Sequence, residues 1–201
     1  MNGPPRRTSA KDDMNLPPLI LASASPRRSD LLRGMGLEIA VVPSAAPEVD
    51  SEQLTAREIS QVNAYRKART VAKKHPDALV LGADTLVYLG TQLFGKPASL
   101  AEAEKMLFQL QGQTHQVVTG VCLIYLRNHR QKIFAESTSV TFRPLTTDQI
   151  RAYLTRVDPL DKAGAYAIQE QGDSIVAEIY GSYSNVVGLP VERLKAELEA
   201  W

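Results

Sequence analysis

Charged side chains interrupt apolar stretches of this chain at a few places, and these are the positions where chemistry is expected. The first is the segment Ser23-Ala-Ser-Pro-Arg-Arg28, which follows an apolar run and precedes a helical pattern. Ser25 and Pro26 are typical of a helix start, so Arg27 and Arg28 fall in the first turn. Because that end of a helix is already positive, two arginines there favour a bound anion such as a phosphate chain. The alternative is that both arginines point into solvent.

The second segment is Gly82-Ala-Asp-Thr85, inside the strongly apolar stretch from residue 78 to residue 88. The carboxylate of Asp84 would be unfavourable in a buried strand unless it is paired or binds a metal ion. We therefore predict that Asp84 is a metal ligand or a base. A structural carboxylate that caps the strand or pairs with an arginine would produce the same pattern.

Two further segments add groups suited to a nucleotide. Lys96, between Gly95 and Pro97, offers a compact ammonium on a constrained loop, which suits phosphate. Residues 161–169 change from polar to small to apolar and end at Gln169, whose amide can both donate to and accept from a base edge. Together these groups indicate metal-assisted hydrolysis of a phosphoanhydride. The glycines do not build a Walker A motif, so the chain is not a P-loop NTPase.

Composition limits the function classes. With a formal net charge of +1 and 6% aromatic residues, the chain has neither a basic footprint nor stacking platforms for nucleic acid. No apolar run is long enough to span a membrane. Cys122 is the only cysteine, lies in an apolar run and is predicted to be a buried small hydrophobe, so nothing indicates an oxidising compartment. We expect a cytoplasmic protein with no membrane or nucleic-acid partner.

The hydrophobic pattern predicts an α/β fold with a mixed sheet, because strands alternate with helices first and a strand pair follows. Residues 1–18 are predicted to be a disordered extension, and residues 19–201 a single domain. The expected strands are 19–22, 38–42, 78–88, 116–126 and 132–142, with short strands over 163–188. Helices are expected to start after caps at Ser25, Thr55, Ser99 and Thr146 or Thr147, and a last one at Pro190.

Six collinear motifs resemble those of the Maf family of nucleotide pyrophosphatases, over residues 19–198. They are Leu21-Ala-Ser-Ala-Ser-Pro-Arg-Arg28, Gly82-Ala-Asp-Thr85, Gly95-Lys-Pro97, Gly112-Gln-Thr-His115, Asp158-Pro-Leu-Asp-Lys-Ala-Gly-Ala-Tyr166 and Gly181-Ser-Tyr-Ser-Asn-Val-Val-Gly-Leu-Pro190. The resemblance implies a two-lobed fold around an elongated mixed sheet flanked by helices, related to the inosine-triphosphate pyrophosphatases. It also implies a cleft between the lobes and a homodimer.

The same resemblance implies a reaction and assigns residues to it. The expected activity is hydrolysis of dTTP and UTP, or modified pyrimidine triphosphates, between the α- and β-phosphates with Mg²⁺ or Mn²⁺, in a house-cleaning role. Asp84 is the expected proton acceptor for water and a metal ligand, and Glu48 is the other acidic position associated with metal. The positions that match phosphate-lining residues are Ser23, Arg28, Lys67 and Lys96. The positions that match specificity residues of the dTTP/UTP-preferring branch are Arg27, Thr85 and Gln169.

The sequence departs from that branch at two positions. Ala167 and Glu170 stand where glycine is usual or frequent, which leaves the reaction class alone but bears on base preference. The alternatives are a 7-methyl-GTP pyrophosphatase and a regulator of cell division that holds a nucleotide without cutting it.

Overall fold

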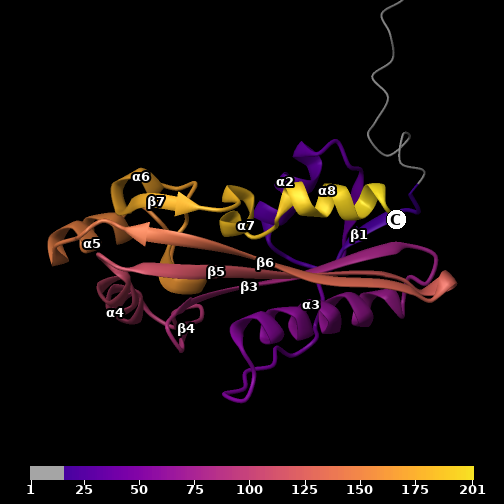
Figure 1. Ribbon diagram of the computed structural model, residues 1–201, viewed down its shortest axis with the longest axis horizontal. Helices are drawn as coiled ribbons and strands as arrows, with labels where there is room; N and C mark the ends of the chain where they lie inside the picture. Colours follow the sequence, from indigo (N-terminus) through magenta and orange to yellow (C-terminus); the bar gives the residue numbers. More distant parts are fainter. Residues whose placement is uncertain (1–15) are drawn as a thin grey trace, which may run out of the picture.

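Three long strands run from one end of the molecule to the other and carry the rest of the fold (Figure 1). The computed structural model describes residues 16–201. The long strands are β3 (Leu79–Leu89), β5 (Thr114–Tyr125) and β6 (Arg130–Phe142). They form the middle of a seven-stranded sheet of order β2-β1-β3-β5-β6-β7, with β4 beside β3. The short strands are β1 (Leu19–Leu21), β2 (Ile39–Val41), β4 (Gln92–Phe94) and β7 (Val176–Tyr180).

The sheet is mixed, which confirms the predicted fold class. β1 pairs in parallel with β2 and β3, whereas β3, β4, β5, β6 and β7 pair with one another in antiparallel fashion. Parallel neighbours need a crossover, and two helices supply it. They are α2 (Pro26–Gly34), between β1 and β2, and α3 (Ala56–Ala72), between β2 and β3.

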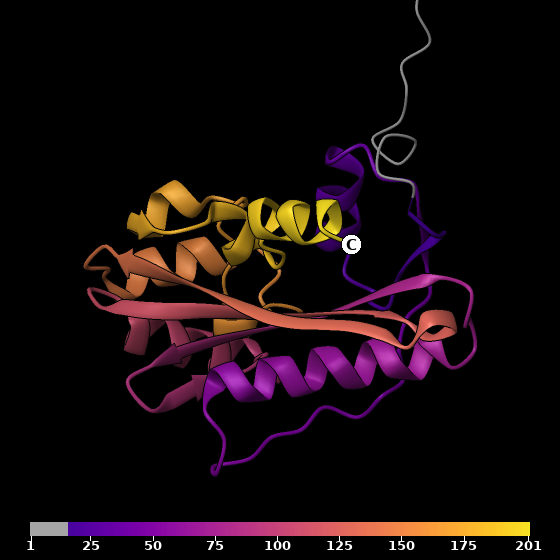
Figure 2. The ribbon, with the colours of Figure 1, turned by 45° about the vertical axis from the view of Figure 1, so that its right-hand side comes forward.

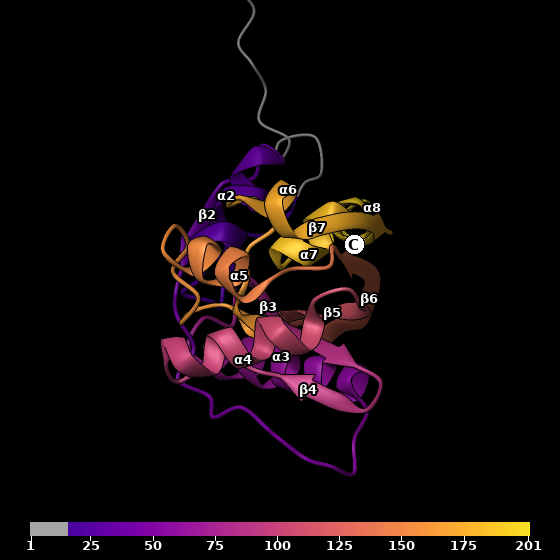
Figure 3. The ribbon, with the colours of Figure 1, turned by 90° about the vertical axis from the view of Figure 1, so that its left-hand side faces the viewer.

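Helices cover both faces of the sheet (Figures 1 and 3). α3 and α4 lie on one face, and α2, α6, α7 and α8 lie on the other. The remaining helices are α4 (Leu100–Leu110), α5 (Thr147–Leu154), α6 (Gly172–Ile175), α7 (Tyr183–Val187) and α8 (Val191–Glu199). Two 3₁₀ turns complete the list, η1 (Leu126–Asn128) and η2 (Ala163–Ala165).

The buried apolar side chains gather toward the two ends of the long strands, which gives the molecule two lobes. One lobe is built around Phe94, Leu107 and Phe142, where α4, α5 and β7 meet the sheet. The other has one core under α2 and α8 and another under α3, which includes the buried thiol of Cys122. Burial raises the pKa of Cys122 to about 12, so it is a small hydrophobe as predicted.

Two glycines let α3 lie directly on the sheet. A Cβ at Gly82 of β3 would overlap the backbone oxygen of Ala64, and one at Gly120 of β5 would overlap the backbone of Ser60. Figure 2 shows α3 extended along this face of the long strands. The close approach brings the middle of α3 within side-chain reach of the strand residue Asp84, which faces Gly120 across the β3–β5 ladder.

Most predicted helix starts are confirmed. The side chains of Thr55, Ser99 and Thr146 each accept a hydrogen bond from the backbone three residues on, as N-caps do. α2 begins at Pro26 as predicted, but the hydroxyl of Ser25 does not cap it. The backbone N–H of Ser25 instead donates to Ser23 Oγ at 3.2 Å, so the turn is closed by the earlier serine.

The segment from residue 163 to residue 188 was expected to hold short strands, and this expectation is wrong in part. It contains a single strand, β7, together with the 3₁₀ turn η2 and the short helices α6 and α7. Apolar runs of this length fit a strand or one turn of helix equally well. The positive φ of Gly164, Ala165 and Gln171 breaks the run into turns that periodicity does not reveal.

The predicted extension over residues 1–18 lies mostly outside the described residues. Its last three residues are described, and they belong to the packed structure. Leu16 is buried in the core under α2 and α8, and the carbonyl of Pro18 accepts a hydrogen bond from Leu79 N–H at 2.9 Å. The packed part of the chain therefore begins before residue 19. Between residues 16 and 201, the helices are too short or too polar for any to cross a bilayer.

Candidate active site

A cleft of about 420 Å³ opens between the two lobes, alongside the part of β3 that carries Asp84 and Thr85. One wall comes from the turn after β1, the start of α2 and the segment after β2, and the other from residues 95–96 and 161–169. All of the predicted site residues line it: Ser23, Arg27, Arg28, Glu48, Lys67, Asp84, Thr85, Lys96 and Gln169. Five cationic side chains and three carboxylates border the cleft, so its lining is net positive and suits an anionic ligand.

The carboxylate of Asp84 is held at both oxygens. Lys67 Nζ donates to Oδ1 at 2.6 Å, and Asn63 Nδ2 donates to Oδ2 at 3.1 Å. Asp84 is 5% exposed, and these two donors compensate for its burial. Each carboxylate oxygen keeps a second lone pair, so Asp84 still has capacity to accept a proton or bind a cation.

Glu48 shares the ammonium of Lys67 with Asp84. Lys67 Nζ donates to Glu48 Oε1 at 2.7 Å, although Glu48 lies in a segment without regular structure. The hydrogen bond from Lys67 lowers the pKa of Glu48 below its usual range, and the charges of Lys67, Lys96 and Arg28 act in the same direction. The cleft therefore holds two carboxylates joined through one lysine.

Arg28 is buried against the base of the cleft. Its Nε donates to the carbonyl of Gly188 at 2.9 Å, and its two terminal nitrogens donate to Ser23 Oγ at 3.0 Å and Thr85 Oγ1 at 2.9 Å. Burial lowers the pKa of Arg28, and the charge of Asp84 partly offsets this. Thr85 is held in turn by the buried hydroxyl of Thr119, 3.0 Å away. Arg28 is thus a fixed cation rather than a solvated one.

Arg27 turns the other way, to the opposite lobe. Its Nη1 donates to Asp161 Oδ2 at 2.9 Å, so an ion pair bridges the mouth of the cleft. Burial alone would raise the pKa of Asp161, but its hydrogen bonds with Lys162 and Arg27 outweigh burial and lower it. The two arginines that were predicted together in the first turn therefore occupy different places, one in the base and one at the rim.

Lys96 and Gln169 are exposed side chains that reach the cleft from the second lobe. The loop of Lys96 is tied to the segment 161–169 by a hydrogen bond from Gly164 N–H to the carbonyl of Gly95, at 3.0 Å. The two side chains therefore come from one joined surface. Gln169 also borders a larger, more apolar groove between α2, α7 and α8.

Comparison with known proteins identifies the family. A family model described as Maf-like protein matches residues 18–201. The chain belongs to the Maf family. A dTTP/UTP pyrophosphatase of Symbiobacterium thermophilum is 48% identical over 87% of this chain and 89% of its own length. A dTTP/UTP pyrophosphatase of Halalkalibacterium halodurans is 46% identical over 88% of this chain and 92% of its own. Among solved structures, a HAM1 protein from Coxiella burnetii is matched with a TM-score of 0.49 and 15% identity, over 92% of this chain and 100% of that one.

The two departures from the dTTP/UTP branch of the Maf family have local explanations. Ala167 does not have a positive φ, so its methyl group creates no backbone strain. Its N–H donates to the hydroxyl of Tyr153 at 3.0 Å, and that hydroxyl donates to the Ala167 carbonyl at 3.3 Å. Glu170 lies 3.7 Å from the buried ammonium of Lys162, so its charge is compensated next to Gln169.

Sequence analysis missed several residues of this Maf site. Asn63 was not selected, although it lies one turn before Lys67 on the same face of α3. Lys162 is 6% exposed and donates to the carbonyl of Asp158 at 2.6 Å and to Asp161 at 2.8 Å. Thr119 anchors Thr85 from β5. The spacing to Lys67 was the signal that could have revealed Asn63.

The donor set suits a hard divalent cation. The described residues contain no cluster of three or more His, Cys, Asp or Glu side chains that would form a complete metal cage. Glu48 and Asp84 nevertheless present carboxylate oxygens in one cleft, bridged by Lys67. Mg²⁺ is commonly held by one or two carboxylates together with substrate phosphates and water. The residues present therefore fit a divalent metal whose remaining ligands are water or phosphate oxygens.

Proposed function

We propose that this chain hydrolyses dTTP and UTP, and modified pyrimidine triphosphates, to the monophosphate and pyrophosphate. The observation that carries the proposal is the carboxylate of Asp84, buried in a strand and facing a net-positive cleft. Membership of the Maf family and relatives named dTTP/UTP pyrophosphatase support this reaction class. A house-cleaning role, the removal of unwanted triphosphates, fits this activity.

The phosphate chain is proposed to bind along the cationic floor and far wall. Arg28 is held with its guanidinium in the base of the cleft, and Ser23 lies beside it with a hydroxyl at 3.0 Å. Lys67 and Lys96 approach from opposite sides of the cleft, from α3 and from the loop after β4. Such an arrangement spreads positive charge along a chain of phosphates without a P-loop.

Asp84 is proposed to accept a proton from the attacking water. The water oxygen bonds to the α-phosphorus, the bond from that phosphorus to the α–β bridging oxygen breaks, and pyrophosphate leaves with that oxygen. The fixed cations stabilise charge that builds on the phosphate oxygens. Asp84 has both oxygens held by donors, so its orientation is set before substrate arrives.

Glu48 and Asp84 are proposed to hold Mg²⁺ or Mn²⁺ together with the phosphates. A divalent ion would supply charge neutralisation on the triphosphate. Lys67, which joins the two carboxylates, would then be free to turn its ammonium toward phosphate.

Arg27, Thr85 and Gln169 are proposed to set base preference. Gln169 is exposed at the cleft wall, and Arg27 lies opposite it at the rim. Replacing Gln169 with Ala should change the ratio of kcat/KM between UTP and other triphosphates by about tenfold, because an amide that reads a base edge is worth 1.4 kcal/mol or more. An equal loss with every substrate would remove Gln169 from this role.

The deciding experiment is pyrophosphate release from a panel of dTTP, UTP, dCTP, modified pyrimidine triphosphates and 7-methyl-GTP, with Mg²⁺, Mn²⁺ or EDTA. We expect metal-dependent release from dTTP and UTP with the monophosphate as co-product. A preference for 7-methyl-GTP would move the chain to the other branch. Binding without any release would favour the non-catalytic regulator. We also propose that the protein is a cytoplasmic homodimer. Sedimentation equilibrium would measure its mass in solution.

A further inference from the structure

Asn63, on the buried face of α3, makes three side-chain hydrogen bonds at the candidate site. It is 2% exposed, and its side-chain amide contacts two separate parts of the cleft. Nδ2 donates to Asp84 Oδ2 at 3.1 Å and to the carbonyl of Val49 at 3.2 Å. Oδ1 accepts a hydrogen bond from Val49 N–H at 2.7 Å.

The other buried residues of α3 are apolar or small, so a buried amide there has a specific reason. They are Ile59, Ser60, Ala64, Ala68, Val71 and Ala72. A buried amide destabilises a protein unless its donors and acceptor are paired. All the hydrogen bonds shown for the Asn63 side chain go to Asp84 or to the segment that carries Glu48. The position is therefore built around the site.

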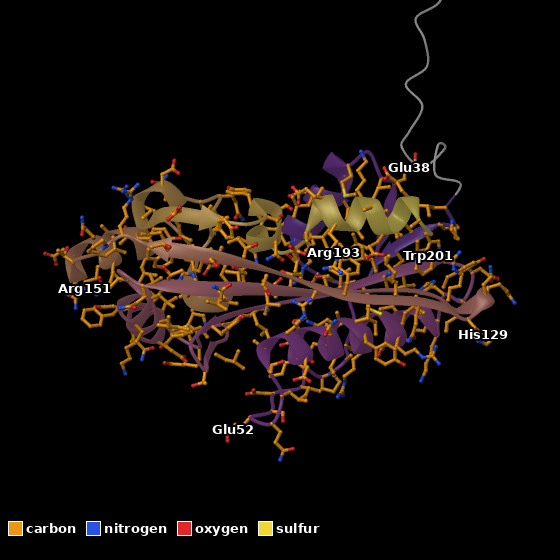
Figure 4. All side chains as sticks on the ribbon, viewed as in Figure 1. Glu38, Glu52, His129, Arg151, Arg193 and Trp201 are labelled. Atoms are coloured by element: carbon orange, nitrogen blue, oxygen red, sulfur yellow. The ribbon has the colours of Figure 1, made fainter. Side chains whose placement is uncertain are left out.

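The segment between β2 and α3 has little structure of its own to hold it. Residues 43–50 form neither helix nor strand, and the segment runs alongside α3 (Figure 2). Its tip, marked by Glu52 in Figure 4, extends away from the sheet. Asn63 forms hydrogen bonds with both the N–H and the carbonyl of Val49, which fixes the residue that directly follows Glu48.

We propose that Asn63 is a positioning residue that sets the distance and orientation between the two carboxylates of the site. One amide group fixes the Asp84 carboxylate through Oδ2 and the Glu48 backbone through Val49. This inference rests on the proposed function, because the pair of carboxylates is assigned there to metal and water. Asn63 itself touches neither substrate nor metal in this assignment.

A neutral amide is suited to this position for an electrostatic reason. Glu48 and Asp84 repel each other, and Lys67 compensates for this only while its ammonium lies between them. When a nucleotide attracts that ammonium, the uncharged Asn63 still holds both partners by hydrogen bonds. Groups that orient metal-binding carboxylates in this way usually change metal affinity or activity by 10- to 100-fold when replaced, as an order of magnitude.

The test compares Asn63→Leu, which keeps the approximate size and removes all three hydrogen bonds, with wild type. Asn63→Ser, which is smaller and cannot reach both partners, is a second variant should the leucine variant fail to fold. Gln111→Leu is the matched control. The Gln111 amide also holds a loop, by accepting a hydrogen bond from Leu145 N–H at 3.2 Å, but Gln111 does not line the cleft.

Three measurements separate positioning from general stability. Mn²⁺ affinity is measured by electron paramagnetic resonance without nucleotide, amide hydrogen exchange reports on residues 43–54, and steady-state kinetics with dTTP give kcat and KM. For Asn63→Leu we expect Mn²⁺ to bind about tenfold more weakly and kcat to fall roughly 10- to 100-fold, while KM changes far less. Exchange over residues 43–54 should become faster.

The same three measurements define the result expected for the control Gln111→Leu and the result that would overturn the proposal. Gln111→Leu should lose thermal stability but keep Mn²⁺ affinity, kcat and exchange of residues 43–54 at wild-type values. The proposal is overturned if folded Asn63→Leu keeps Mn²⁺ affinity within about twofold of wild type, or if Gln111→Leu loses as much. If wild type releases no pyrophosphate, the proposed reaction is lost, while the nucleotide-free Mn²⁺ and exchange results still judge Asn63.

Discussion

The two ion-pair groups of the cleft are held in opposite ways. In the centre, the Lys67 and Asp84 side chains are 14% and 8% exposed, and the backbone of α3 lies directly on Gly82 and Gly120 beneath them. At the rim, the Arg27 and Asp161 side chains are 22% and 50% exposed and come from different lobes. The central groups are fixed by packing, whereas the rim groups are fixed by the ion pairs of Asp161 with Arg27 and Lys162.

This difference separates two tasks that one cleft must perform. Buried charges interact strongly and cannot be left unpaired, so the Asp84 carboxylate, which Asn63 also holds, keeps one geometry whichever base is bound. An exposed ion pair is worth little and is screened by salt, so it can open when a ligand offers better contacts. We infer that the centre determines the reaction class and that the rim adapts to the base.

The largest expected effect lies in the centre. Asp84→Asn keeps the shape of the side chain and an oxygen for Lys67, but it removes the proposed proton acceptor. We expect kcat to fall by roughly 10³-fold in a variant that still folds, with a lower melting temperature because the new amide NH₂ group faces the donor Nδ2 of Asn63. Pyrophosphate release and thermal denaturation provide the measurements, and Asp77→Asn, an exposed carboxylate paired with Arg127, is the control. Turnover near the wild-type value would contradict the assignment.

The second prediction concerns the packing that fixes the centre. Gly120→Ala places a methyl group against the backbone of Ser60, so α3 must move away from the sheet. We expect a loss of about 3 kcal/mol in the free energy of unfolding, together with reduced activity. Gly34→Ala in α2 is the control, because no atom lies within 4 Å of the added Cβ. If activity survived intact in Gly120→Ala, the close approach would not be what aligns α3 with Asp84.

A buried polar side chain, His115, also lies outside the cleft, and it should affect stability rather than activity. His115 is buried with Nε2 2.9 Å from the hydroxyl of Tyr166, and burial lowers its pKa from 6.5 to about 4. Since the unfolded chain binds the proton first, the neutral form stabilises the fold fully above pH 6.5, and this contribution is lost as pH falls toward 4. We expect a loss of roughly 2–3 kcal/mol of stability at pH 4.5 relative to pH 7.

Denaturant titrations of wild type and His115→Gln at both pH values would measure this loss. The variant does not titrate in this range, so its stability should change less between the two pH values. An equal pH dependence in both proteins would show that His115 is not the cause. At pH 7 we expect folded His115→Gln to keep its pyrophosphatase activity, because His115 does not line the cleft.

The smallest effect is expected at the rim. Asp161→Asn removes the charge that pairs with Arg27 and with Lys162. The new side chain keeps an amide oxygen for Lys162, whose ammonium also donates to the carbonyl of Asp158, and half of the Asp161 side chain is exposed. We expect the free energy of unfolding to change by less than about 1 kcal/mol. Chemical denaturation at low and high salt would test this, because any contribution should shrink as salt increases. A loss of more than about 2 kcal/mol in the free energy of unfolding would mean that the ion pairs at the rim stabilise the fold as strongly as those in the centre.

Sequence patterns predicted the features that depend on local chemistry. The apolar runs of β3, β5 and β6 and the caps at Thr55 and Ser99 were found because each is encoded within a few residues. The family resemblance selected nine residues that line one cleft. Their roles in binding and catalysis remain predictions that the variants above test.

Features that depend on how elements pack could not be read from the chain. Asn63 lies in the polar run Gln61-Val-Asn-Ala-Tyr-Arg66, and only the contact of α3 with Gly82 and Gly120 turns it toward Asp84. Ser25 occupies the N-cap position of α2 as predicted, but its hydroxyl makes no capping hydrogen bond, and its own N–H donates to Ser23 Oγ. The different directions of Arg27 and Arg28 likewise depend on Asp161 and Gly188, which are more than 100 residues away in sequence.

The long strands also limit how the molecule can move. Because β3, β5 and β6 pass through both lobes as one paired ladder, they act as a common beam. Bringing the lobes together as rigid bodies would bend three strands at once and disrupt ladder hydrogen bonds. We therefore expect a ligand to be enclosed by exposed side chains of the cleft walls, such as Lys96 and Gln169, over a stiff floor. The cleft therefore has a rigid floor and adjustable side chains on its walls, and it does not close by a hinge between the lobes.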